Sequence, residues 1–325
     1  MVTIRNHYLP KFYLEYFLPK KEPRVFWVYD KEGGEPRAQT PVNTGIERHL
    51  YNVIWPDSSV DDYIERKVFG PIESIAKPII DRWLKTHRIS ESEIPKIAAF
   101  LAFMNTRVPR NIETIREVGA VLATCLMKDL AKKPEEIKKY LSRLKKEREI
   151  KEIKSIKEMQ NILENFEENF HVSMSKKPAM AMSLLLTEEV DRQLLNMNWC
   201  IYRAPRDSFF ITCDSPLVCF VLDKNGMATF GGGFGLPNAE VTFPLSPDEC
   251  LYLDRKQTNA YRAISKKIVK EINRRTAWMA ERFIISMIRT NCVKRIVEES
   301  SVTIKEPKMD KKKLIQIFKS ERLSG

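Results

Sequence analysis

The spacing of apolar residues changes near residue 197, and this change restricts the folds open to the chain. Before it, apolar residues recur at helical intervals, as at Ile64, Val68, Ile72, Ile75, Ile79 and Trp83. After it, apolar runs separated by turn residues are typical of strands, at 198–204, 208–213, 217–222, 240–246 and 250–254. We therefore predict an α+β fold, with a helical layer at about 60–195 packed on a mainly antiparallel sheet built from about 198–254.

Three features of the pattern refine this prediction. Gly70-Pro71 interrupts the first helical stretch, and proline removes a backbone donor, so we expect a kink or a break there. The stretch 97–104 is apolar on every side, which predicts a helix at the centre of the fold, stopped by Pro109. A long helix near the C-terminus is predicted from about Asn259 to Arg282.

The charge distribution predicts the domain organisation. Residues 128–158 carry twelve basic and seven acidic side chains with sparse apolar positions, so we expect a charged helical arm at about 128–170. We predict one α+β domain over 1–300 and a basic tail at 301–325. The aromatic N-terminal stretch 6-NHYLPKFYLEYF-17 should dock into the core, because such side chains are not left in water.

The net charge of +12, from 55 basic and 43 acidic residues, favours an acidic partner. Nucleic acid or a nucleotide is the predicted partner, and a protein bound to the 128–170 arm is the alternative. The side chains expected to neutralise phosphates are Lys132, Lys133, Lys138, Lys139, Lys145, Lys146, Lys311, Lys312 and Lys313.

The chain is expected to be cytoplasmic and to have no membrane partner. No apolar run reaches the roughly 18 residues that span a bilayer, and Lys11, Glu15 and Lys20 interrupt any signal-peptide core. The six cysteines form no C-x-x-C pair and lie mostly in apolar runs, so we interpret them as reduced core thiols.

The stretch 208-SFFITCDSPLVCFVLD-223 holds the best single candidate for a functional residue. An apolar run reaches Asp214, is broken by Ser215-Pro216 and then resumes, which predicts a carboxylate held at a tight corner between two strands. Asp214 either caps this turn by accepting a nearby backbone amide or acts in a functional site.

Other candidates come from the helical half and the N-terminus. Arg107 follows the most buried helix, where it would bind a carboxylate or a phosphate, or neutralise carbonyls at the helix end. Glu65 and Glu73 lie about two turns apart on one helix flank, as metal or base carboxylates or as solvated side chains. His7 either shuttles protons or anchors the terminus.

Four motifs occur in one order along the chain: H-Y-L-P-x-F-Y-L-x-x-F at 7–17, R-x-P at 107–109, F-I-T-x-D-x-P at 210–216 and F-P-L-S-P at 243–247. Together they resemble the bacterial and archaeal family called domain of unknown function 4238, over about 6–290. The usual third motif is T-S-D-x-P, and Cys213 stands here in place of its serine. The family has no established reaction, so the resemblance implies only that His7, Arg107 and Asp214 form a set.

Three classes of function fit these observations. The first is a metal-assisted phosphodiester hydrolase, in which Asp214 with Glu65 or Glu73 holds Mg²⁺ or Mn²⁺, Arg107 clamps a phosphate and His7 moves protons. The second is a non-enzymatic module that binds nucleic acid or protein through its charged surface. The third is a ligand sensor with Arg107 and Asp214 in its pocket. Convergence of the candidates in one place would favour a catalytic or ligand site.

Overall fold

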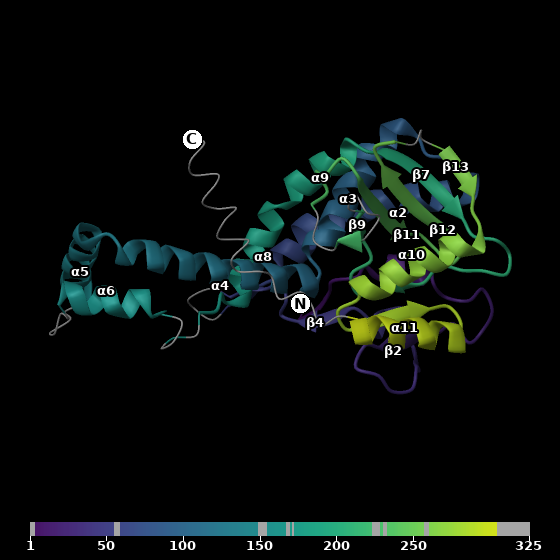
Figure 1. Ribbon diagram of the computed structural model, residues 1–325. Coiled ribbons are helices and arrows are strands. Elements are labelled where there is room, and N and C mark those ends of the chain that lie inside the picture. Colours follow the sequence, from purple (N-terminus) through teal and green to yellow (C-terminus); the bar gives the residue numbers. More distant parts are fainter. Residues whose placement is uncertain are drawn as a thin grey trace. The chain divides into compact units, whose positions relative to one another are not determined.

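The computed structural model describes residues 4–54, 59–148, 155–166, 170, 172–222, 228–229, 233–256 and 260–303. The fold is α+β, as predicted, and the chain divides into two compact units (Figure 1). The first unit comprises Met1–Asn111 and Ser183–Lys305, and the second comprises Ile112–Met182 and Glu306–Gly325. The predicted tail at 301–325 lies almost entirely outside the described residues.

A six-stranded sheet forms the centre of the first unit, in the order β10-β9-β11-β12-β7-β13 (Figure 1). Neighbouring strands are antiparallel except β13, which runs parallel to β7. The strands are β7 (Asn198–Arg203), β9 (Val218–Leu222), β10 (Ala228–Thr229), β11 (Ala239–Pro244), β12 (Glu249–Asp254) and β13 (Ala260–Ala263). The predicted sheet from 198–254 is therefore confirmed.

Helices cover both faces of this sheet. On β7, Trp199 packs edge-on against Trp83, with ring centroids 6.3 Å apart, whereas the next residue, Cys200, packs with Val269 and Ile272. Because successive side chains of a strand point to opposite faces, the first face meets α2 and the second meets α10. Burial on both faces explains why these strands are continuous apolar runs. The covering helices are α2 (Gly70–Thr86), α3 (Ile94–Thr106), α9 (Thr187–Leu195) and α10 (Lys266–Met279).

A second sheet of four strands joins distant parts of the chain, in the order β3-β2-β14-β8. It consists of β2 (Phe26–Asp30), β3 (Arg37–Gln39), β8 (Thr212–Cys213) and β14 (Phe283–Ser286), and α11 (Asn291–Thr303) packs on it. Strands β8 and β9 thus belong to different sheets. Asp214 lies where the chain crosses from one sheet to the other, so its corner is not a hairpin turn.

The aromatic N-terminal stretch is docked in the core, as expected. Tyr13 and Phe17 are fully buried, and the Tyr13 hydroxyl lies 2.6 Å from Thr212 Oγ1 and donates to the Pro244 carbonyl at 3.0 Å. The segment contains β1 (Arg5–His7), paired with β4 (Ile46–Arg48), and the short helices α1 (Lys11–Glu15) and η1 (Pro41–Asn43). Strands β5 (Val53–Ile54) and β6 (Val60–Asp61) form a small ladder after it.

The predicted interruption at Gly70-Pro71 is a π-helix, η2 (Ile64–Phe69), which leads directly into α2. The Gly70 amide donates to the Glu65 carbonyl, five residues earlier. Pro71 explains the wide turn, because a proline ring clashes with the carbonyl four residues before it in an α-helix and supplies no amide donor. Helix η2 therefore continues into α2 without a break but with a changed register.

The C-terminal end of α2 is bound to strands at one edge of the six-stranded sheet through polar and aromatic contacts. His87, in the left-handed conformation that ends the helix, places its Nδ1 2.7 Å from Oε1 of the buried Glu249. Tyr261 on β13 donates to the same oxygen at 3.1 Å, and its ring packs 4.9 Å from the imidazole. These contacts fix α2 on the sheet at the end remote from η2.

Two helix boundaries differ from the sequence predictions. The helix expected from residue 259 begins at Lys266, because 260–263 pairs with β7 as β13. The four residues of β13 are half-buried or exposed, and their side chains do not alternate between apolar and polar, so the sequence did not indicate a strand there. Pro109 follows the end of α3 as predicted, but it also begins the next helix, where a first-turn proline loses no hydrogen bond.

The second unit is helical. It contains α5 (Pro134–Arg148) and α6 (Ile156–Glu164), together with most of α4 (Pro109–Ala131) and of α8 (Lys176–Leu185). Its small core is formed by Ala131, Ile137 and Leu163, which are buried together. The arm predicted at 128–170 lies within this unit. None of the described helices combines the length and the apolar composition needed to cross a membrane.

Candidate functional site

Polar side chains from five segments of the first unit come together around the N-terminal end of α2. We call them the Glu65 cluster: Asn6 on β1, Tyr51 before β5, Glu65 on η2, Glu73 in the first turn of α2 and Arg107 at the end of α3. The predicted candidates Glu65, Glu73 and Arg107 are therefore brought together.

Arg107 is the buried cation of the Glu65 cluster, with 1% of its surface exposed. Its guanidinium donates to Glu73 Oε1 at 2.7 Å and lies 4.9 Å from the centre of the Phe69 ring. Its backbone carbonyl accepts from the Tyr51 hydroxyl at 2.7 Å. A guanidinium so enclosed cannot reach a large substrate. Its charged contact in the described chain is with the Glu73 carboxylate, which it holds in place.

Glu65 is half-buried and carries the most informative pKa of the cluster. Burial raises the pKa of Glu65 to about 7, with opposing effects from the charge of Arg107, which lowers it, and that of Glu73, which raises it. Asn6 donates from Nδ2 to Glu65 Oε2 at 3.2 Å, which favours the charged form. Near neutral pH, Glu65 therefore exists in both protonation states, as suits proton transfer.

The π-helix contributes to this convergence. In a continuous α-helix, eight residues rotate by about 800°, which would leave Glu65 and Glu73 about 80° apart around the axis. Each hydrogen bond of η2 spans one residue more, so the chain rotates less per residue there. The two carboxylates thus lie closer to one face than α-helical spacing places them. Single π-helical turns within α-helices are frequent at functional sites.

His7 lies at the margin of the Glu65 cluster. Its ring donates to backbone carbonyls of Val42 and Pro41, and Nε2 is buried without a partner in the described chain, so the donor is Nδ1. Burial lowers the pKa of His7, although the charge of Glu73 opposes this. The imidazole is therefore neutral at neutral pH, and its free Nε2 is a proton acceptor.

Asp214 does not join the Glu65 cluster. Its two carboxylate oxygens accept from the amides of Glu281 at 2.9 Å and Arg282 at 2.7 Å, in the turn between α10 and β14. Burial raises the pKa of Asp214 to about 6, although both amides lower it. Arg107 pairs with Glu73 rather than with Asp214. The carboxylate at the corner thus holds a remote turn in place instead of capping its own.

Sequence reasoning missed two members of the Glu65 cluster, Asn6 and Tyr51. Asn6 is fully buried, and its Oδ1 accepts from the Tyr51 amide at 3.3 Å while its Nδ2 binds Glu65. The sequence could have indicated Asn6, because it precedes the aromatic motif expected to dock into the core, and an amide buried there needs a hydrogen-bond partner. Tyr51 carried no such signal, because an aromatic residue beside a strand is ordinary core.

Other predicted residues fall elsewhere. Among the described residues, no group of three or more His, Cys, Asp or Glu side chains is arranged to hold a metal ion. Lys132, Lys133, Lys138 and Lys139 belong to the second unit. The side chains of Lys145 and Lys146, and all of Lys311, Lys312 and Lys313, lie outside the described residues.

Comparison with known proteins supports the family suggested by the sequence motifs. No curated protein and no solved structure matches the chain. The model of the family described as "Protein of unknown function (DUF4238)" matches residues 5–290. This range includes every residue of the Glu65 cluster together with His7 and Asp214. Because the match covers most of its length, the chain belongs to the DUF4238 family of proteins of unknown function.

Proposed function

We propose that the Glu65 cluster is an acid–base site that hydrolyses a phosphodiester of nucleic acid or a nucleotide. The observation that carries the proposal is the half-buried Glu65, with a pKa of about 7 beside a second carboxylate held by a buried arginine. A general base is most effective when its pKa lies near the working pH. Perturbed carboxylates of this kind gather at functional sites.

Glu65 is assigned as the base that takes a proton from the attacking water. Its Oε2 is oriented by Asn6, whose other end is fixed by the Tyr51 amide, so the carboxylate has a defined direction. His7, with a neutral ring and a free Nε2, would accept or relay the proton at the margin of the site.

Arg107 and Glu73 set the electrostatics of the site. The buried guanidinium offsets the charge of both glutamates and keeps the pKa of Glu65 from rising further. An anionic substrate is consistent with the net charge of +12, which draws phosphates toward the protein. A divalent cation such as Mg²⁺ or Mn²⁺ would have Glu65 and Glu73 as ligands, because Asp214 is bound to backbone amides.

The test is hydrolysis of bis(p-nitrophenyl) phosphate and of a labelled single-stranded oligonucleotide, with Mg²⁺, Mn²⁺ or EDTA. The rate should rise with pH through a midpoint near 7, because Glu65 must be deprotonated to act as base. Glu65→Gln should lower the rate by roughly 10²–10⁴-fold, the usual contribution of a general base.

The matched control is Glu91→Gln, an exposed glutamate of η3 (Glu91–Glu93), which should leave the rate unchanged. Full activity in Glu65→Gln would show that Glu65 is not the base. Absence of turnover by the unsubstituted protein on both substrates, under all three metal conditions, would reject phosphodiester hydrolysis.

A further inference from the structure

Two arginines of the first unit face each other across the short ladder of β1 and β4. Arg5 on β1 is directly opposite Arg48 on β4, and both residues are exposed. The His49 amide donates to the Ile4 carbonyl at 2.9 Å, so the neighbouring pair is the hydrogen-bonded one. Arg5 and Arg48 therefore form a non-hydrogen-bonded pair, the type that holds opposite side chains closest, with Cβ atoms about 4.5–5.5 Å apart.

We call the face of the ladder that carries these two arginines the Arg5 face. Like charges directly opposite each other destabilise a ladder. Arg5 donates to Asn43 Oδ1 at 3.1 Å, and among the described residues no acidic side chain lies within ion-pair distance of Arg5 or Arg48. Glu47, the residue before Arg48, points to the other face of the ladder, where its Oε2 lies 3.5 Å from Arg282 Nη2. The Arg5 face thus has two positive charges that no carboxylate of the described chain offsets.

The Arg5 face is distinct from the Glu65 cluster. Asn6 turns its side chain to Glu65 on one face of β1, and successive side chains of a strand point to opposite faces. Arg5 contacts Asn43, and the His7 ring donates to carbonyls of η1, so these two residues share the face toward η1. Burial lowers the pKa of His7, and the charge of Arg5 lowers it further, so the guanidinium lies close to the imidazole.

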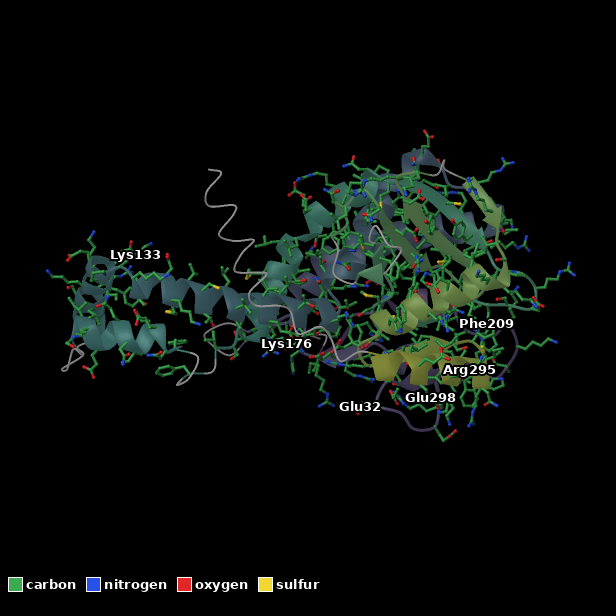
Figure 2. All side chains as sticks on the ribbon, in the orientation of Figure 1. Glu32, Lys133, Lys176, Phe209, Arg295 and Glu298 are labelled. Carbon is green, nitrogen blue, oxygen red and sulfur yellow. The ribbon has the colours of Figure 1, made fainter. Side chains whose placement is uncertain are left out.

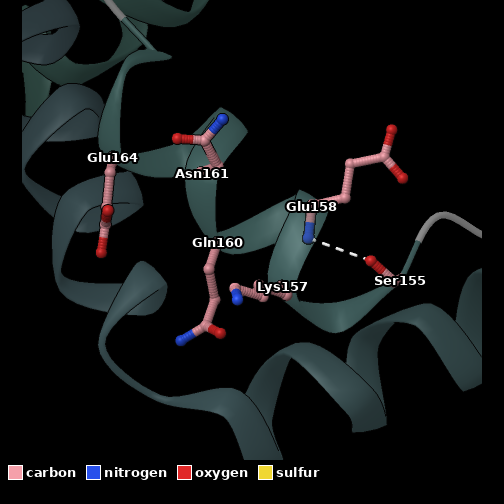
Figure 3. Close-up of a pocket in the computed structure, with 6 residues that line it drawn as sticks. All are labelled: Ser155, Lys157, Glu158, Gln160, Asn161 and Glu164. Carbon is pink, nitrogen blue, oxygen red and sulfur yellow. Dashed lines mark hydrogen bonds between the residues drawn. The ribbon is translucent and has the colours of Figure 1, made fainter.

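Two exposed lysines of the second unit show a contrasting arrangement. Lys133 places its Nζ 3.1 Å from Asp129 Oδ2 (Figure 2). Lys157 lines an open hollow over α6 together with Glu158 and Glu164 (Figure 3). In both places a carboxylate of the chain accompanies the cation, so neither surface has an excess of positive charge. The arginines of the Arg5 face need an anion from outside the described chain to reach the same balance.

We propose that the Arg5 face binds a terminal phosphate group, with the guanidiniums of Arg5 and Arg48 on opposite sides of it. A guanidinium presents a planar pair of N–H donors that matches two oxygens of a phosphate. A phosphate monoester carries about two negative charges near neutral pH and therefore offsets both arginines, whereas a carboxylate or a single phosphodiester supplies one. Inorganic phosphate, a free mononucleotide and the 5′-phosphorylated end of a strand all offer this group.

The inference goes beyond the proposed hydrolysis, because it concerns a phosphate that is bound and not attacked. The ligand would lie on the Arg5 face, whereas Glu65 is reached from the other face of β1. A terminal phosphate site beside a phosphodiesterase site would select strands by their ends. The binding site would exist even if the Glu65 cluster had another role.

Isothermal titration calorimetry of the full-length protein with adenosine 5′-monophosphate (AMP) at low ionic strength tests the proposal. Arg5→Gln and Arg48→Gln should each weaken AMP binding by roughly 10–100-fold, the usual effect of a hydrogen bond to a charged group. Arg48→Lys keeps the charge without the planar fork, so it should bind with an intermediate affinity. Affinity of the unsubstituted protein should rise from pH 5 to 7, because the phosphate gains its second charge with a pKa of about 6.

The imidazole of His7 provides a second measurement in the same protein. Because the charge of Arg5 lowers the pKa of His7, a bound phosphate that offsets this charge should raise that pKa. NMR titration of the His7 ring with and without AMP measures the change. The change should be absent in Arg5→Gln/Arg48→Gln, and its persistence there would show that AMP binds elsewhere.

The matched control is Arg88→Gln/Arg206→Gln, which removes two exposed arginines of the same unit and the same total charge. It should bind AMP like the unsubstituted protein. Without AMP, Arg5→Gln/Arg48→Gln should keep or raise the melting temperature, because it removes a like-charge pair, so a loss of binding would not reflect misfolding. An equal loss in the control, or no AMP binding by the unsubstituted protein, would overturn the proposal.

Oligonucleotides distinguish the possible sources of the phosphate. A strand with a 5′-phosphate should bind more tightly than the same strand with a 5′-hydroxyl, and equal affinities would contradict recognition of a terminal phosphate. Tighter binding of the phosphorylated strand than of AMP would identify strand ends as the ligand, and the reverse would identify a free nucleotide. AMP contains no phosphodiester, so its binding is measured independently of hydrolysis, and either proposal can fail without the other.

Discussion

Replacing Asp214 by asparagine tests the balance of forces at the corner between the two sheets. The carboxylate is 1% exposed and accepts two backbone amides, from Glu281 and Arg282. Burial disfavours its charged form, whereas the two amides favour that form. Burial prevails and raises the pKa of Asp214 from 3.8 to about 6. Asp214→Asn removes the titration and keeps the shape.

The sign and size of the effect follow from linkage. With its pKa raised in the folded state, Asp214 binds more protons folded than unfolded between pH 3.8 and about 6, so its contribution to stability falls as pH rises. The shift corresponds to about 3 kcal/mol in all, of which about 2 kcal/mol lies between pH 4.5 and 7.5. Asp214→Asn lacks this loss. Relative to the unsubstituted protein, it should therefore gain about 2 kcal/mol across that interval, whatever constant cost the lost amide contact adds.

Urea denaturation of both proteins at several pH values from 4.5 to 7.5 measures this difference directly. Asp248→Asn, at an exposed carboxylate of the same unit, supplies the baseline for replacing a surface aspartate. A difference in unfolding free energy that stays constant with pH, or that turns against Asp214→Asn as pH rises, would refute the reasoning. The second result would mean that the amides outweigh burial and depress the pKa of Asp214.

Two further predictions concern Arg107 and Gly45. Arg107→Met removes the charge that lowers the pKa of Glu65, so the midpoint of the pH–rate profile should move upward from about 7 by on the order of one unit; an unmoved midpoint in the phosphodiester assay would contradict the assigned coupling. Gly45→Ala should lower the unfolding free energy by about 1–3 kcal/mol in urea denaturation, because φ is +68° and the new Cβ would lie 2.7 Å from Leu9 Cβ. Gly119→Ala, where the new methyl meets only the flexible end of Met174, should cost less, and equal losses would count against this steric argument.

The sequence was sufficient for the fold class because the relevant signals are local. The spacing of Ile72, Ile79 and Trp83 specifies a helix, and the runs at 217–222 and 250–254 specify buried strands. The interruption at Gly70-Pro71 was also readable, since proline acts on its own helix. The start of α10 could not be predicted, because the residues just before it form β13. That strand is stabilised by its pairing with β7 and has no alternating pattern in the sequence.

The candidate site was predicted in part. Glu65, Glu73 and Arg107 were named from their places on helices, but nothing local showed that Arg107 would pair with Glu73. The sequence placed Asp214 at a corner correctly and its partners wrongly, since the bonding amides lie 67 and 68 residues further along the chain.

By itself, the sequence of this protein determined which segments are helix or strand and which side chains bear charge, because backbone sterics and apolar periodicity act within a few residues. Only the tertiary structure decided what each charge does. The pKa of Glu65 depends on its burial and on Arg107, Glu73 and Asn6, which come from three separate segments. Burial and electrostatic pairing are properties of the packed chain. The sequence therefore shows Glu65 only as a carboxylate on a helix, whereas the fold raises its pKa to about 7.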